Sequence, residues 1–257
     1  MTDSASQFSG SQEGVQPRTH PDSERHSIII AGMPQAGSTL CYNLARLLVE
    51  RSFYTLIAYV QDPPKFVYCC EVADSDRHYE IVKQHDLAAD IRNRHGWPPN
   101  VYVINIKRDL RDTIASAMRK LPEGEELDIL ETCERNLDWH GAWSTLTDYE
   151  WVYESYKKNP LKVMRELQKA LKLNLDDDAL NEVIAVAENL KTVMSSLDDA
   201  DHQREFANIT RMDKTQITNN GEIGGYKKTL TEEQIGLIET TYNDWLVENG
   251  YLTKESL

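Results

Sequence analysis

Short apolar runs alternate with longer segments of helical periodicity along the chain. Residues 28–30 are three consecutive isoleucines, a β-branched run typical of a strand buried on both faces. Residues 101–106 form the clearest strand pattern of the sequence. Further strands are predicted at 54–60, 66–70 and 150–154, and residues 79–83 fit either a strand or a helix end.

Helices are predicted between these strands. Leucines recur at helical spacing over residues 40–48, Asp109 is suited to cap the helix that follows the 101–106 strand, and Thr231 with Gln234 forms a capping box. Because strands alternate with helices, we expect an α/β fold, a single domain with a central, mostly parallel sheet flanked by helices. The remaining predicted helices cover 87–96, 127–146, 160–171, 178–197 and 231–248, and the polar residues 198–220 are predicted to form a loop.

Composition fits one globular domain. The 257 residues are 40% hydrophobic and 27% charged, and no apolar stretch is long enough to span a bilayer. Residues 1–25 are predicted to be a disordered tail without the layout of a signal peptide, and residues 26–257 the folded domain. The four cysteines show no metal-ligand spacing, so we expect a reduced, cytoplasmic protein without a bound metal.

The formal net charge of −14 argues against a nucleic-acid or other polyanion binder, since such proteins need basic surfaces. It also means that any anionic ligand must be held by local donors against an unfavourable overall field. Those donors are therefore the residues to find.

A glycine-containing turn separates the first strand from the first helix. Gly32, Pro34 and Gly37 interrupt regular structure here. A strand, turn and helix in this order direct backbone N–H groups and the positive end of a helix dipole toward an anion. The spacing from Gly32 to Gly37-Ser38-Thr39 is close to a Walker A loop, but Ser38 stands where that motif requires lysine. The sequence predicts a phosphate-binding turn that is not an ATPase loop, with an ordinary tight turn as the alternative.

Four short segments occur in an order that resembles one enzyme family. They are Pro-Gln-Ala-Gly-Ser-Thr at 34–39, Lys-Gln-His at 83–85, Arg-Asp-Leu-Arg-Asp-Thr-Ile-Ala-Ser at 108–116, and Asn-Gly-Glu-Ile-Gly-Gly-Tyr-Lys at 220–227. Together they resemble the cytosolic-type sulfotransferases, which have a P-loop-like fold. The resemblance implies a sulfotransferase that moves a sulfuryl group from 3′-phosphoadenosine-5′-phosphosulfate (PAPS) to a hydroxyl or amine of a small molecule. The product would be adenosine 3′,5′-bisphosphate (PAP), with no metal required.

The resemblance also implies a role for each segment. His85 would be the general base, since an unperturbed histidine pKa of about 6.5 suits that task, and Lys83 would donate to the transferring group. Glu71 and Asp86 are competing bases, and an ordinary surface histidine is the alternative for His85. The cofactor would be bound by Gln35, Ala36, Gly37, Ser38 and Thr39 at the 5′-phosphosulfate, by Arg108 and Ser116 at the 3′-phosphate, by Tyr153 near the adenine, and by Asn220, Gly221, Tyr226 and Lys227 in a closing loop.

Arg108 and Ser116 also fit such a ligand on geometric grounds. In a helix starting after Arg108, Ser116 lies about 10 Å further along the axis, so the two side chains can reach one elongated anion. Pairing of Arg108 with Asp112 on its own helix is the alternative.

Gln35 departs from the family, which usually has a cation at this position to steady charge on the leaving phosphate. Such a loss removes a term of about 3 kcal/mol. Either Lys83 or another basic group substitutes, or the enzyme is slow, or the chain binds a nucleotide without chemistry. A P-loop nucleotide kinase is the other alternative, opposed by the missing Walker lysine.

The acceptor is expected to be a small hydroxylated molecule, and the sequence does not indicate an oligomeric state. Four aromatic residues could wall an apolar acceptor pocket, although aromatic residues at helical spacing also suit a core. They are Trp139, Trp143, Tyr149 and Trp151.

Overall fold

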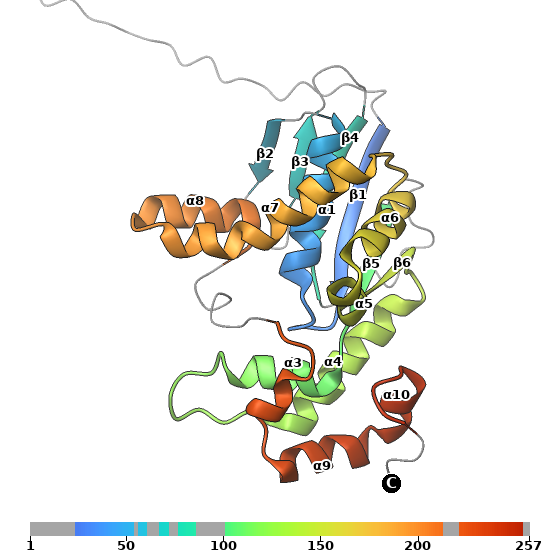
Figure 1. Ribbon diagram of the computed structural model, residues 1–257, viewed down its shortest axis with the longest axis vertical. Coiled ribbons are helices and arrows are strands. Elements are labelled where there is room, and N and C mark those ends of the chain that lie inside the picture. Colours follow the sequence, from blue (N-terminus) through green and yellow to red (C-terminus); the bar gives the residue numbers. More distant parts are fainter. Residues whose placement is uncertain are drawn as a thin grey trace, which may run out of the picture.

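Six strands form one sheet in the part of the chain that the computed structural model describes, namely residues 24–53, 56–60, 67–71, 77–85, 101–212 and 221–253. The strand order is β2-β3-β4-β1-β5-β6, and β4, β1, β5 and β6 are parallel (Figure 1). β2 and β3 extend this group by antiparallel pairing. The predicted α/β fold with a mostly parallel sheet is therefore confirmed. The strands are β1 (Glu24–Gly32), β2 (Leu56–Val60), β3 (Val67–Glu71), β4 (Arg77–Lys83), β5 (Val101–Lys107) and β6 (Tyr149–Val152).

Successive residues of β1 face opposite sides of the sheet, and helices cover both sides. Ile28 and Ile30 pack with Leu44 of α1 and with residues of α6 and α7 on one side. Ile29 packs with Trp143 of α4 on the other side. The isoleucine run is thus buried on both faces, as predicted. The helices are α1 (Ser38–Phe53), α3 (Leu110–Met118), α4 (Ile129–Ser144), α5 (Tyr153–Lys158), α6 (Pro160–Ala170), α7 (Asp177–Ser196), α8 (Ala200–Thr210), the 3₁₀ helix η2 (Gly225–Lys228), α9 (Glu232–Thr241) and α10 (Asn243–Glu248).

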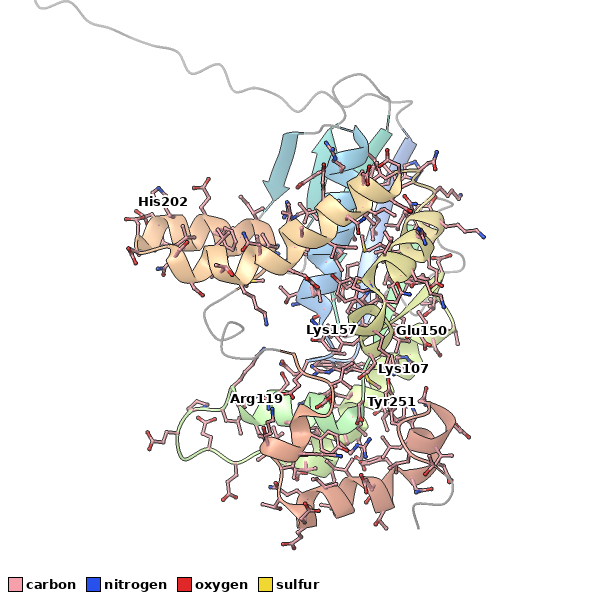
Figure 2. All side chains as sticks on the ribbon, in the orientation of Figure 1. Lys107, Arg119, Glu150, Lys157, His202 and Tyr251 are labelled. Carbon is pink, nitrogen blue, oxygen red and sulfur yellow. The ribbon has the colours of Figure 1, made fainter. Side chains whose placement is uncertain are left out.

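A second hydrophobic cluster lies beyond the carboxyl ends of the parallel strands, where α3, α4, α9 and α10 meet (Figure 1). Leu110 of α3, Tyr226 of η2 and Ile238 of α9 are buried in it. The segment after α10 then returns toward the sheet, and the Tyr251 hydroxyl donates to Glu154 Oε2 at 3.2 Å (Figure 2). The C-terminal elements are thereby attached to the start of α5, close to the strand ends.

The expectation of a polar loop over residues 198–220 is wrong in part, because α8 begins at Ala200. Its N-cap is Asp199, whose Oδ1 accepts from the backbone N–H groups of Asp201 and His202, both at 2.9 Å. Phe206 anchors α8 by packing against buried residues of α7. The apolar residues of α8 are too few to form a periodic pattern, and the sequence therefore did not indicate this helix. α7 and α8 together extend away from the sheet, with His202 near the tip (Figure 2).

Three other predicted elements differ in their limits. Residues 79–83 belong to a strand, β4. β6 ends at Val152 because its partner β5 ends at Lys107, and Tyr153 already begins α5. The predicted final helix is divided at Tyr242 into α9 and α10, and the capping box of α9 is confirmed. The predicted helix over 87–96 lies outside the described residues, as do residues 1–23 of the predicted tail.

Two of the aromatic residues considered for an acceptor pocket belong to the core. Trp143 and Trp151 are fully buried, one on each side of the sheet. Trp139 and Tyr149 are only half-buried.

Candidate active site

The parallel strands end along one edge of the sheet, and candidate residues follow them directly. β1 ends at Gly32 and β4 at Lys83, while β5 and β6 are followed at once by Arg108 and Tyr153. β1 lies between β4 and β5, so the connections on its two sides diverge here. In open α/β sheets this divergence opens a crevice at the carboxyl ends of the strands, where ligands bind.

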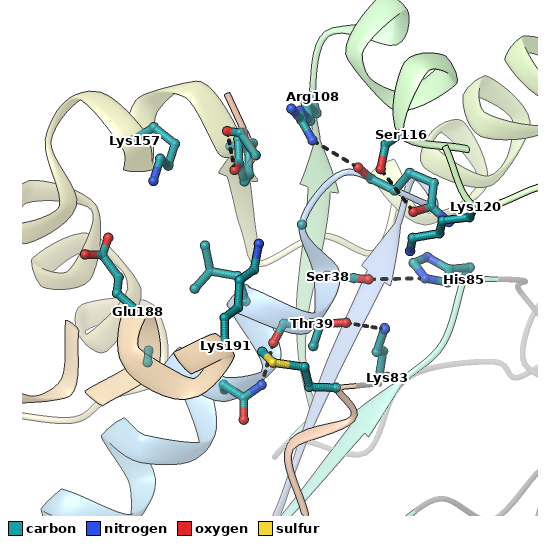
Figure 3. Close-up of a pocket in the computed structure, with 18 residues that line it drawn as sticks. Ser38, Thr39, Lys83, His85, Arg108, Ser116, Lys120, Lys157, Glu188 and Lys191 are labelled. Atoms are coloured by element: carbon teal, nitrogen blue, oxygen red, sulfur yellow. Dashed lines mark hydrogen bonds between the residues drawn. The ribbon is translucent and has the colours of Figure 1, made fainter. Parts of the chain in front are cut away.

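A cavity of about 420 Å³ occupies this edge (Figure 3). The turn at Gly37 and the strand–helix segment at Arg108 both line it, so the two predicted phosphate-binding segments share one crevice. The predicted site residues that line the cavity are Gln35, Gly37, Ser38, Thr39, Lys83, His85, Arg108, Ser116, Tyr153 and Gly221.

The turn before α1 is held in an unusual backbone conformation. Gln35 and Gly37 have φ values of 61° and 92°, and a Cβ at Gly37 would lie 2.6 Å from Cδ2 of Tyr153. Glycine is required there by both the conformation and the close contact. The helix starts at Ser38 and its first turn carries no acidic residue, so its positive end meets the cavity uncompensated.

His85 is oriented by its neighbours. Its Nδ1 lies 2.8 Å from the carbonyl oxygen of Gly32, and a carbonyl can only accept, so Nδ1 carries the proton. Its Nε2 is then unprotonated and accepts from the Ser38 hydroxyl at 3.3 Å. The Trp143 indole N–H donates to the His85 carbonyl at 2.8 Å. The imidazole therefore presents a lone pair at the cavity.

Burial and the positive charges of Lys83 and Lys120 lower the pKa of His85 to about 4. The ring is accordingly neutral near pH 7, the state that a general base needs. A bound negative charge nearby would raise this pKa toward its usual value, which would make Nε2 a better proton acceptor. Lys83 is directed toward the same turn and donates to Thr39 Oγ1 at 2.8 Å (Figure 3).

Arg108 connects three segments and is only 3% exposed. Its Nη1 donates to the Gln35 carbonyl at 3.4 Å and its Nη2 to the Glu222 carbonyl at 3.2 Å. The guanidinium lies 4.2 Å from the centre of the Tyr153 ring, and Nη2 is 3.6 Å from Asp112 Oδ2. Arg108 therefore pairs with Asp112 and also lines the cavity. The Nε donor of Arg108 is buried and finds no acceptor among the described residues.

Ser116 and the loop near residue 221 complete this end of the cavity. The Ser116 hydroxyl donates to Gln35 Oε1 at 3.4 Å. The Tyr153 hydroxyl donates to the Gly221 carbonyl at 2.6 Å, and a Cβ at Gly221 would lie 1.9 Å from that hydroxyl. Close approach of the loop thus depends on glycine at this position.

Several predicted site residues do not line the cavity. Ala36 is fully buried under the turn. Tyr226 packs into the cluster beyond the strands, where the Arg111 guanidinium covers its ring at 4.5 Å. Lys227 is exposed on η2, and Asn220 lies outside the described residues.

Three cations that the sequence reasoning missed also line the cavity, Lys120, Lys157 and Lys191. With Lys83 and Arg108 they place five cationic side chains around one crevice, and Glu188 is the one acid that lines it among the described residues. Burial, followed by repulsion from Lys157, Arg108 and Lys120, lowers the pKa of Lys191.

A sequence signal for two of them existed. Lys120 lies four residues after Ser116, one helical turn further along the same face, and Lys191 shares a face of α7 with Ala187 and Glu188. The apolar stripe of α7 concealed this second, polar face.

Comparison with known proteins supports the fold. Residues 149–250 match the family model for the sulfotransferase domain. No curated protein sequence matches the chain. The crystal structure of mouse sulfotransferase SULT7A1 complexed with PAP is 12% identical, with 87% of this chain and 84% of that chain covered and a TM-score of 0.52.

Retinol dehydratase is similar in two further structures. Its complex with androsterone and the inactive cofactor PAP is 13% identical, with a TM-score of 0.53, and its complex with retinol and PAP is 15% identical, with a TM-score of 0.52. Each covers 90% of this chain and 82% of the other. The chain therefore has the fold of sulfotransferases, and its resemblance to that family is confirmed.

Two features are absent from the described residues. No helix there is long and apolar enough to cross a membrane. No group of three or more histidine, cysteine, aspartate or glutamate side chains in that part of the chain is arranged to hold a metal ion.

Proposed function

We propose that this chain, which has the fold of sulfotransferases and matches their domain model over residues 149–250, transfers a sulfuryl group from PAPS to a hydroxyl or amine of a small-molecule acceptor. One observation carries this proposal. Two turns far apart in the sequence, at Gly37 and Arg108, line one cavity with five cationic side chains, in a protein of net charge −14. A nucleotide with anionic groups at both ends matches that arrangement.

The residues present fit the two anionic ends of PAPS. The N-terminus of α1, with the hydroxyl groups of Ser38 and Thr39, suits the 5′-phosphosulfate. Arg108 and Ser116 suit the 3′-phosphate, and the Nε donor of Arg108, for which the described part of the chain offers no acceptor, supports this role. Three apolar side chains near α7 also line the cavity and suit the adenine ring of the nucleotide, namely Leu40, Ala187 and Met212.

PAPS supplies a sulfuryl group whose bond to the 5′-phosphate oxygen breaks as the acceptor attacks sulfur. The protein's part is to position and to move a proton. The attacking hydroxyl or amine gives its proton to Nε2 of His85, because Nδ1 is held in its protonated state by the Gly32 carbonyl. Lys83 donates near the 5′ end, beside Thr39. Of the competing bases, the side chain of Glu71 and all of Asp86 lie outside the described part of the chain.

The kinase alternative receives less support from the geometry. A magnesium-dependent kinase needs a carboxylate at a strand end to hold its metal. Asp109 has that position after β5, but its Oδ1 accepts from the Arg111 backbone N–H at 2.9 Å and its Oδ2 pairs with the Arg111 guanidinium at 2.7 Å. Its carboxylate is therefore committed to the helix cap.

The binding test uses calorimetry with PAP and with adenosine 5′-monophosphate, which lacks the 3′-phosphate. We expect Ser116→Ala and Arg108→Lys to weaken PAP binding by about tenfold or more and to change binding of the monophosphate by less than about threefold, since one charge-assisted hydrogen bond is worth about 1.5–3 kcal/mol. Equal losses for both nucleotides would refute the assignment of the 3′ end. Ser116→Ala removes a single hydroxyl group, so it tests the site even where Arg108→Lys perturbs folding.

The activity test measures PAP release from PAPS with a panel of phenols, alcohols and amines. Turnover with at least one acceptor is the expected result. PAP binding without turnover on any acceptor would favour the nucleotide-binding alternative. Thermal stabilisation by ATP with magnesium, but not by PAP, would favour the kinase.

A further inference from the structure

Sulfuryl transfer needs a positive charge where the bond to the leaving phosphate breaks, because negative charge develops there. The side chain at the corresponding point of the turn is Gln35, which is neutral. The cavity nevertheless holds five cations, so the question is which of them lies at the sulfuryl end. The answer rests on the proposed function, because only a sulfuryl donor gives the cavity such an end.

The position of His85, the proposed proton acceptor, identifies the sulfuryl end of the cavity. His85 Nε2 and Ser38 Oγ are 3.3 Å apart at the start of α1, so an acceptor that transfers its proton to Nε2 must lie beside them. A cation that acts on the transferred group has to be near both residues. Figure 3 shows the amino group of Lys120 directed toward this pair.

The end of α3 positions Lys120. Its backbone N–H donates to the Ala117 carbonyl at 3.0 Å, in a turn that directly follows α3. Ser116, one turn earlier, donates to Gln35 Oε1 at 3.4 Å, so this face of α3 is turned toward Gln35. Lys120 is half-buried, and its positive charge contributes to the low pKa of His85.

Lys83 is also close to His85, since its charge lowers the pKa of His85 more than that of Lys120 does, but its ammonium group is bonded to the turn, and the other three cations lie elsewhere. Lys83 donates to Thr39 Oγ1, and Arg108 is held by the Gln35 and Glu222 carbonyls. Lys157 is exposed on α5, and Figure 3 shows Lys157 and Lys191 on the opposite side of Ser38 from His85. Lys157 and Lys191 are therefore associated with the far end of the cavity.

We propose that Lys120 is a catalytic residue that contacts the sulfuryl group during transfer and supplies the positive charge that Gln35 does not provide. In this step the acceptor oxygen forms a bond to sulfur, and the bond from sulfur to the bridging oxygen breaks. That electron pair remains on the 5′-phosphate, and the acceptor's proton moves to His85 Nε2. Lys120 donates hydrogen bonds and keeps its own proton.

The kinetic test compares Lys120→Met, Lys120→Arg and the matched control Lys158→Met, since Lys158 is exposed on α5 and does not line the cavity. We expect Lys120→Met to lower kcat by about 100-fold or more, the size of one transition-state donor, with PAP affinity changed by less than about fivefold. Lys120→Arg should retain more activity than Lys120→Met. Lys158→Met should leave kcat within about threefold of the unsubstituted protein.

A relocated charge gives the sharpest check. Adding Gln35→Lys to Lys120→Met returns a cation to the same end of the cavity from the turn. We expect kcat of this double variant to be at least about tenfold higher than that of Lys120→Met. An unchanged kcat in Lys120→Met would overturn the inference while leaving the proposed function intact, and so would a failure of Gln35→Lys to restore any of the kcat lost in Lys120→Met.

A further measurement does not depend on turnover. The imidazole of His85 is titrated by NMR, with His85→Gln used to assign its signal. Lys120→Met should raise the pKa of His85, and Lys158→Met should leave it unchanged. An unchanged His85 pKa in Lys120→Met would place the ammonium away from the proton acceptor and overturn the inference. Absence of both PAP binding and turnover in the unsubstituted protein would instead overturn the proposed function, and the inference with it.

Discussion

Asp112 joins the strand–helix segment to the C-terminal loop, so its replacement by asparagine should affect both fold and site. The side chain is 1% exposed. Its Oδ1 accepts from the Tyr226 backbone N–H and its Oδ2 from that of Gly224, both at 2.9 Å. Oδ2 also faces Nη2 of Arg108 at 3.6 Å.

The expected cost of Asp112→Asn can be worked out from these contacts. Asparagine keeps one acceptor oxygen and turns an NH₂ group toward a backbone N–H or toward Arg108. One charge-assisted hydrogen bond is lost, worth about 1.5–3 kcal/mol, and the buried guanidinium loses its counter-charge. We therefore expect a loss of about 3 kcal/mol in the free energy of unfolding, or about 6–12 °C in Tm for a domain of this size.

Urea and thermal unfolding measure this loss, with Asp128→Asn as the matched control. Asp128 caps α4 on the surface and accepts from the Glu131 backbone N–H at 2.9 Å. Asparagine caps a helix about as well as aspartate, so the control should change stability by less than about 0.5 kcal/mol. A value for Asp112→Asn within about 1 kcal/mol of the unsubstituted protein would disprove this account of the carboxylate. It would mean that the loop N–H groups are satisfied without it.

Three further predictions concern the turn and the proposed base. Gly37→Ala combines a φ of 92° with a Cβ 2.6 Å from Tyr153, whereas the control Gly124→Ala has a φ of 87° and no atom within 4 Å of its Cβ. In urea unfolding, Gly37→Ala should therefore lower the free energy of unfolding by at least about 1 kcal/mol more than Gly124→Ala. Equal losses would show that the contact with Tyr153 is not tight. His85→Gln should lower turnover by about 10²–10⁴-fold with PAP affinity kept, and activity like that of the unsubstituted protein would place the base elsewhere. The same variant tests pH dependence: the folded state holds the His85 pKa at about 4, below an unfolded value of about 6.5, so the unfolded state binds more protons between these values and stability falls as pH decreases. Beside Lys83 and Lys120, His85 should contribute a loss of about 2 kcal/mol between pH 7.5 and pH 5 that is missing in His85→Gln, and identical pH profiles would contradict the buried neutral ring.

Local signals were enough to predict the elements that present the site. The isoleucine run, the glycines of the turn and the capping aspartate at position 109 act within a few residues of themselves, so their structural meaning can be read from the sequence. The same holds for the capping box at Thr231 and Gln234. The strand–turn–helix segment and the α/β class could therefore be predicted from these signals, whereas Lys83, His85, Tyr153 and Gly221 were expected from the family resemblance.

The convergence of these pieces, and the charge that surrounds them, depend on the three-dimensional fold. The sheet register aligns the ends of β1, β4, β5 and β6, and three separate parts of the chain, the turn after α3 and the helices α5 and α7, then contribute Lys120, Lys157 and Lys191 to one crevice. The fold also buries Tyr226 in another cluster and lowers the pKa of His85. Electrostatic interaction depends on distance in space and on burial, and neither quantity can be read from the positions of charges along a chain of net charge −14.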